Sequence, residues 1–224
     1  MKTKLSYLSI LLYVLVSSQE NSVINDLKFS NYTGYPKKIT EITTFSNQDI
    51  DKSISYFDKE GFLTKIEYYN AVESEPSHKR SLNKIITYNS KDKAKRYFEA
   101  FNPGNKKIET TGYFEKISDS LYKRVSETPF RNISLTKLFY FDKNNRLIKT
   151  EETGIFFETP VNSIILYTYT PQKETLLEDV IKQKKSKLIY QNVKLDQHEN
   201  PVYEELADDH GTLKQKIERE FEYY

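Results

Sequence analysis

Short segments in which apolar and polar residues alternate follow one another from residue 27 to the end of the chain. The clearest is the last one, where Ile217, Arg219, Phe221 and Tyr223 share one face and three glutamates share the other. A period of two places one row of side chains against a core and the other in water, as in a half-buried β-strand. The same criterion predicts strands at 37–45, 54–57, 62–69, 84–88, 96–101, 107–114, 135–141, 147–151, 163–169 and 216–223.

One segment fits two patterns. Leu176, Leu177, Val180 and Ile181 have the spacing of a helical stripe. They also fit the first strand of a hairpin that turns at 182–186 and returns through 188–190. Residues 173–186 therefore stay open between helix and hairpin, and the hairpin is the preferred prediction.

Four turns between these segments share a template that begins with aspartate, at 58–63, 142–147, 196–202 and 208–213. An aspartate at the first turn position accepts hydrogen bonds from backbone N–H groups two residues further on. The fourth position turns left-handed to rejoin the twisted strand, which favours glycine or asparagine. Gly61, Asn145 and Gly211 meet this requirement. Glu199 does not, so a different turn type is predicted there.

Two copies of the template carry an aromatic pair before the aspartate and a leucine after the turn, at 56–63 and 140–147. In this form the pattern resembles the YD (RHS-type) repeats of exported bacterial proteins. The stretch from Tyr97 to Phe114 is more similar to MORN-like hairpins. The resemblance implies a spiralling sheet of stacked hairpins and a structural motif without catalytic residues. The copies begin at 58, 142, 196 and 208, which departs from the regular spacing of a tandem array.

The predicted fold class is all-β, an antiparallel hairpin meander in a single curled or partly closed sheet. Sequential hairpins need only short connections. Two stretches are polar and contain proline, as long loops do, at 72–82 and 126–133. Residues 19–224 are expected to form a single hairpin-repeat β domain, with a sub-sheet break near 126–133 as an open alternative.

The first eighteen residues have the layout of a signal peptide. Lys2 and Lys4 form a basic start, an apolar run extends from Leu5 to Val16, and Ser18 precedes the expected cleavage point. A dozen apolar residues suit a signal sequence and fall short of the roughly 20 that a membrane span needs. The alternative is an uncleaved N-terminal anchor. The expected location is therefore secreted or periplasmic, with no membrane span after cleavage.

Charge and composition narrow the classes of binding partner that the protein could have. Removal of Lys2 and Lys4 leaves 32 basic and 32 acidic residues, a balance that argues against nucleic acid and against electrostatic binding to an anionic membrane. Cysteine is absent, so no disulfides stabilise the exported chain. The chain has 18 tyrosines and 13 phenylalanines, and these aromatic residues favour strands. We expect most tyrosines to cover the core and to pair across strands.

No catalytic, cofactor-binding or metal-binding residue is predicted. His198 and His210 each follow an aspartate by two residues, so together with Asp196 and Asp208 they would offer a metal site if the hairpins were neighbours. The preferred interpretation is that both histidines are exposed turn residues. The carboxylate pair at 204–205 is expected to be solvated. The final strand lacks the lipid-facing alternation of an outer-membrane barrel.

The sequence therefore favours an exported, non-enzymatic interaction or scaffold module whose partner is an unidentified protein or glycan. One alternative is an envelope carbohydrate-active enzyme. It would require two carboxylates about 5 to 10 Å apart in a cleft with aromatic walls. Another is an immunity partner of a secreted toxin.

Overall fold

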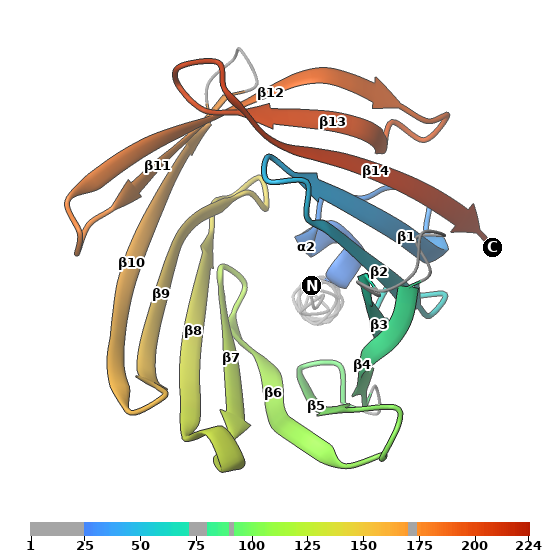
Figure 1. The fold of residues 1–224 in the computed structure, drawn as a ribbon, viewed down its shortest axis with the longest axis vertical. Coiled ribbons are helices and arrows are strands. Elements are labelled where there is room, and N and C mark those ends of the chain that lie inside the picture. Colours follow the sequence, from blue (N-terminus) through green and yellow to red (C-terminus); the bar gives the residue numbers. More distant parts are fainter. Residues whose placement is uncertain (1–24, 72–79, 90–91, 170–173) are drawn as a thin grey trace, which may run out of the picture.

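Fourteen strands form one closed antiparallel barrel in the computed structural model, which describes residues 25–71, 80–89, 92–169 and 174–224 (Figure 1). Each strand pairs with the next along the chain, and β1 closes the ring by pairing with β14. The strands are β1 Pro36–Phe45, β2 Ile50–Phe57, β3 Leu63–Ala71, β4 Arg80–Tyr88, β5 Lys95–Phe101, β6 Ile108–Ser118, β7 Leu121–Thr128, β8 Ile133–Phe141, β9 Leu147–Phe156, β10 Thr159–Tyr169, β11 Glu174–Asp179, β12 Lys184–Leu195, β13 Pro201–Ala207 and β14 Leu213–Tyr223.

The predicted all-β hairpin meander is confirmed, and its sheet closes completely. Closure leaves no unpaired sheet edge, which removes a site for aggregation. The hairpin is also the correct choice for the described residues 174–186, because β11 and β12 pair in antiparallel register. The sheet does not break near 126–133, since β7 and β8 stay paired through Thr128 and Ile133. The predicted signal peptide, 1–18, lies outside the described residues.

All four aspartate turns have the same geometry. In the first, Asp58 Oδ1 accepts from the backbone N–H groups of Glu60 and Phe62, and the Gly61 N–H donates to the Asp58 carbonyl. The turn at 196 repeats each bond, and Glu199 takes the left-handed position with φ 65°. The prediction of a different turn type there was wrong. The aspartate bonds hold the turn even where its fourth residue has a side chain.

The outer face of the barrel carries a repeated three-residue unit beside these turns. In the first copy the Tyr56 hydroxyl donates to Glu67 at 3.0 Å, Lys65 pairs with Glu67 at 2.8 Å, and the Lys65 ammonium lies 4.0 Å from the Tyr56 ring centre. The second copy has the same contacts at Tyr140, Lys149 and Glu151. In the third copy the lysine and the tyrosine exchange strands. Lys194 lies over the Tyr203 ring, and the Tyr203 hydroxyl donates to Glu205.

A short helix, α2 (Asp26–Phe29), lies within the ring of strands near β1 and β2 (Figure 1). The segment around it, residues 25–35, is here called the plug. Leu27 packs in a buried cluster with Ile39 and Phe57. Phe29 makes edge contacts with four rings, at Phe114, Tyr122, Phe139 and Phe141. The plug therefore supplies the apolar core that a single sheet cannot make by itself.

Two aspartate turns hold the plug at one end of the barrel. At the first, the Leu27 N–H donates to the Gly61 carbonyl at 3.2 Å. At the other, the Asn200 amide accepts from the Thr33 N–H at 2.8 Å and donates to the Thr33 carbonyl at 2.9 Å. Asn200 is completely buried and also donates to the Tyr223 hydroxyl. In the part of the chain that the structure describes, no helix is long and apolar enough to cross a membrane.

Candidate functional site: the pocket between plug and barrel wall

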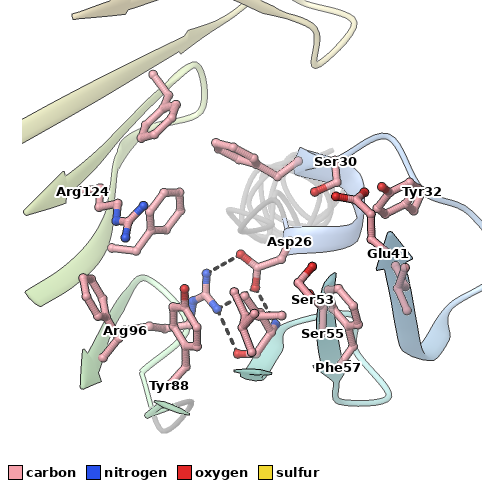
Figure 2. Close-up of a pocket in the computed structure, with 17 residues that line it drawn as sticks. Asp26, Ser30, Tyr32, Glu41, Ser53, Ser55, Phe57, Tyr88, Arg96 and Arg124 are labelled. Carbon is pink, nitrogen blue, oxygen red and sulfur yellow. Dashed lines mark hydrogen bonds and ion pairs between the residues drawn. The ribbon is translucent and has the colours of Figure 1, made fainter. Parts of the chain in front are cut away.

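A pocket of about 400 Å³ lies inside the barrel, between the plug and the inner face of β1 to β8. Its walls combine aromatic and aliphatic side chains with hydroxyl and charged groups (Figure 2). The apolar lining is Phe29, Ile39, Phe57, Leu63, Ile66, Phe98, Phe114 and Phe139, and the polar lining is Asp26, Ser30, Tyr32, Glu41, Ser53, Ser55, Tyr88, Arg96 and Arg124. Small-molecule sites in proteins have this mixed character and volumes of roughly 300 to 1,000 Å³.

Asp26 of the plug and Arg96 of β5 form an ion pair in the lining of the pocket. Two guanidinium nitrogens of Arg96 donate to the two Asp26 oxygens at 2.6 and 2.7 Å, and the Leu63 N–H donates to Asp26 at 2.6 Å. Arg96 is 2% exposed and lies among three aromatic rings, at Phe62, Tyr88 and Phe114. This bidentate geometry satisfies a charge that would be costly to bury alone. The pair fastens the plug to the wall.

A second inward-facing arginine lies outside the pocket lining and is held by two carboxylates, one of which, Glu41, lines the pocket. Arg219 of β14 donates to Glu41 of β1 and to Glu204 of β13, each at 2.7 Å. Burial favours a lower pKa for Arg219, but Tyr32, Glu41 and Glu204 outweigh it and raise that pKa. Glu204 is buried, so the prediction that the 204–205 pair is solvated was wrong for this residue.

Arg124 is the other arginine of the pocket lining, and its surroundings differ from those of Arg96. Its guanidinium lies 5.2 Å from the Phe98 ring centre. Among the residues that the structure describes, no carboxylate lies within ion-pair distance of it. Its side chain is solvent-accessible, unlike those of Arg96 and Arg219. Figure 2 shows it on the wall across the pocket from Glu41 and Tyr32.

Lys84 of β4 adds a further positive charge to the inner face. It is the register partner of Tyr68, which is itself opposite Ser53 of the pocket wall. Burial lowers the pKa of Lys84, Glu109 opposes this, and the positive charges of Arg124 and Arg131 lower it further. Lys84 and Arg124 therefore repel each other across this part of the lumen.

The tyrosines of the pocket are protonated hydroxyl donors at neutral pH. Burial raises the pKa of Tyr88 to about 12, although the Arg124 charge acts in the opposite direction. Burial likewise raises the pKa of Tyr32 to about 12. Neither group is suited to act as a base, because removing its proton requires a strongly alkaline medium.

The histidines singled out in the sequence do not come together. The Asp196 and Asp208 turns are at opposite ends of β13, so His198 and His210 cannot share a metal ion. His210 is 83% exposed, as expected for a turn residue. His198 instead packs on the Tyr223 ring, with ring centres 4.2 Å apart.

The tyrosines divide between the two faces rather than gathering in the core. Tyr97 and Tyr113 pair across strands on the outside of the barrel, as the sequence predicted for part of the set. Three others belong to the outer Tyr–Lys–Glu units. The expectation that most tyrosines cover the core was therefore only partly correct.

Comparisons with known proteins identify a fold. No protein-family model matches the chain, and no curated protein matches it in sequence. A solved porin-like protein from Bacteroides uniformis is similar with a TM-score of 0.55 at 9% identity, over 84% of this chain and 98% of that one. A porin-like protein from Bacteroides vulgatus has a TM-score of 0.50 at 11% identity, over 86% and 99%. The likeness is one of fold.

Proposed function

We propose that this protein is a non-enzymatic binding protein of the bacterial cell envelope that holds a small ligand in the barrel lumen. The observation that carries the proposal is the pocket of about 400 Å³ between the plug and the wall, with apolar surfaces and convergent polar groups. The plug is fixed by the Asp26–Arg96 ion pair and by hydrogen bonds to two turns, so the pocket is preformed. The envelope location rests on the signal-like start of the sequence, and it agrees with the porin-like neighbours.

A binding role suits the outer face better than a role as a pore in lipid. The outer Tyr–Lys–Glu units, together with ion pairs such as Lys95–Glu115, place charge around the wall. A barrel in a membrane needs an apolar band about 25 Å tall, and a lysine or arginine at its midplane costs about 2–4 kcal/mol. We therefore propose a barrel that works in an aqueous compartment, and the YD-type turns serve as its structural frame.

The carbohydrate-active enzyme remains the second candidate, because Asp26 and Glu41 line one pocket with aromatic walls. Their partners argue against it. Both Asp26 oxygens accept from Arg96, and Glu41 accepts from Arg219. A glycosidase needs one carboxyl group that is free to donate a proton. Release of reducing ends from bacterial cell-wall polysaccharides, lost in Glu41→Gln, would support the enzyme against the binding protein.

The lumen proposal is tested with N-phenyl-1-naphthylamine, a neutral apolar probe that fluoresces when it leaves water. Ser53→Trp places a large ring in the pocket, whereas Lys52→Trp adds the same ring to the outer face of the same strand. We expect the wild type and Lys52→Trp to bind the probe and Ser53→Trp to lose binding at least tenfold. Equal binding by both variants, or none by the wild type, contradicts a lumen site. Circular dichroism and urea midpoints establish that each variant is folded.

The location is tested separately by expressing the full chain with its first eighteen residues and fractionating the cells. We expect the protein in the periplasm or medium, with Gln19 as its N-terminal residue. Retention in the cytoplasm with Met1 intact would contradict the export part of the proposal and leave the pocket untouched.

A further inference from the structure

We propose that the lumen pocket recognises an amphiphile with one anionic group, such as a carboxylate or phosphate on an apolar body, and that Arg124 binds that group while Lys84 adds positive charge to the same inner face. The inference rests on the proposed function, because it names the class of ligand for the same site.

A comparison of Arg124 with the two other inward-facing arginines gives the first argument. Arg96 and Arg219 are each neutralised by carboxylates within 2.7 Å and are nearly inaccessible. Arg124 lines the pocket, is accessible to solvent, and has no carboxylate within ion-pair distance among the described residues. Its cation–π contact with the Phe98 ring leaves its N–H donors available. A guanidinium with available donors suits bidentate recognition of a carboxylate or phosphate.

Lys84 gives the second argument. Lys84 of β4 is partly buried on the same inner face as Arg124 of β7, and burial and the Arg124 charge lower its pKa while Glu109 opposes this. An anion bound at Arg124 would offset the repulsion between the two positive charges. The Arg124 charge also acts on Tyr68 and Tyr88, so the hydroxyl groups of these tyrosines offer neutral donors around such an anion.

The walls define the rest of the ligand. Phe98, Phe114 and Phe139 come from neighbouring strands on the side of Arg124, and Ile66 lines the pocket from β3. These surfaces favour an apolar or flat body, which is buried while its charged end meets Arg124. The volume of about 400 Å³ admits a body of drug-like size rather than a bare ion.

The test compares two probes that share one aromatic body. 8-Anilinonaphthalene-1-sulfonate carries a sulfonate, and N-phenyl-1-naphthylamine lacks it. We expect the wild type to bind the sulfonate probe more tightly, and Arg124→Gln to weaken that probe by roughly 10- to 100-fold, the range for hydrogen bonds to charged groups. The neutral probe should be unaffected. Lys84→Gln should weaken binding of the sulfonate probe less than Arg124→Gln does. Lys123→Gln, on the outer face of the strand that carries Arg124, should leave the binding of both probes unchanged.

The outcomes separate the two proposals. If both probes bind the wild type equally and Arg124→Gln changes neither, the anionic class is wrong and the lumen site survives. If neither probe binds, the proposed function itself fails. Competition then identifies the source of the anion: laurate, but neither dodecanol nor inorganic phosphate, should displace the sulfonate probe. Displacement by millimolar phosphate alone would overturn the amphiphile and indicate a free ion.

Discussion

The two halves of the barrel wall differ in how they are supported. Every buried hydrophobic side chain in the described part of the chain lies in the plug, in the wall from β1 to β8, in the turn after β2, or in β13. Among the residues of β9 to β12 whose burial the structure describes, only Thr150 and Thr175 are buried. The plugged side has a core, whereas the far side is held mainly by its hydrogen-bonded ladders and by surface ion pairs. The sheet is continuous, but its stability is not uniform.

Loss of a carboxylate should separate the two halves most strongly. Asp26→Ala leaves the buried Arg96 charge unpaired, which should lower the free energy of unfolding by about 3–5 kcal/mol. Glu178→Ala removes the exposed partner of Lys185 on the far wall and should cost at most about 1 kcal/mol. Urea unfolding followed by circular dichroism measures both. Equal losses would mean that the plug does not anchor the near wall.

The same truncation in both halves gives the next largest contrast. Leu27→Ala empties part of the buried cluster under the plug and should cost about 3 kcal/mol. Leu177→Ala on the far wall starts from a half-exposed side chain, so about 1 kcal/mol is expected. Unfolding midpoints at fixed pH decide the order. A larger loss for Leu177→Ala would contradict the assignment of the core.

Alanine substitutions of two glycines in identical turns test the comparison with a single added methyl group in each turn. Gly61 and Gly211 have φ of 84° and 76°, so alanine at either costs about 1–2 kcal/mol of backbone strain. A Cβ at Gly61 would also lie 2.7 Å from the Asn25 side chain of the plug, whereas one at Gly211 meets nothing within 4 Å. Gly61→Ala should therefore be the more destabilising. Equal unfolding free energies for Gly61→Ala and Gly211→Ala would mean that the plug moves aside to accommodate the added methyl group at no cost.

Protonation of a turn aspartate in acid should give the smallest change in stability. Aspartate turns occur in both halves of the wall, so this effect does not distinguish them. Hydrogen bonds from Lys214 and two backbone N–H groups lower the pKa of Asp208 to about 2. Its unfolded pKa is about 3.9, so its contribution is full above that pH and is lost as pH falls through 2. In Asp208→Asn, the urea midpoint should therefore fall less between pH 4 and pH 2 than it does in the wild type. A midpoint that falls as steeply as in the wild type would contradict the role of this carboxylate.

Most strands and all four turns were predictable because their signals are local, although β7 and β13 were not among the predicted strands. Alternation placed Ile217, Arg219 and Phe221 on one face, and the barrel has them inside. Aspartate chemistry located all four turns. Glu199 was the exception, because the side-chain bonds of Asp196 compensate for a left-handed residue that the sequence rule disfavours.

Closure and the plug were not predictable, because both depend on contacts between distant residues. Alternation says which face of β1 is buried but not that its partner is β14. The helix at Asp26–Phe29 is a single turn, too short to produce a periodic pattern. One signal for the pocket was present: Arg96 and Arg219 occupy the inward phase of apolar strands, where a charge requires a partner. Nothing local identified that partner as Asp26 or Glu41.

The bond between Thr33 and Asn200 joins residues 167 positions apart, and this separation bears on how the chain matures. A chain made from its N-terminus exposes Leu27 and Phe29 long before residue 200 or the closing strand exists. Contacts of such long range form slowly, because loop-closure entropy is lost before they contribute. Until the final hairpin arrives, the early segment therefore presents apolar side chains that a holding chaperone would shield. Sealing of the barrel and seating of its plug would then be one late, coupled event.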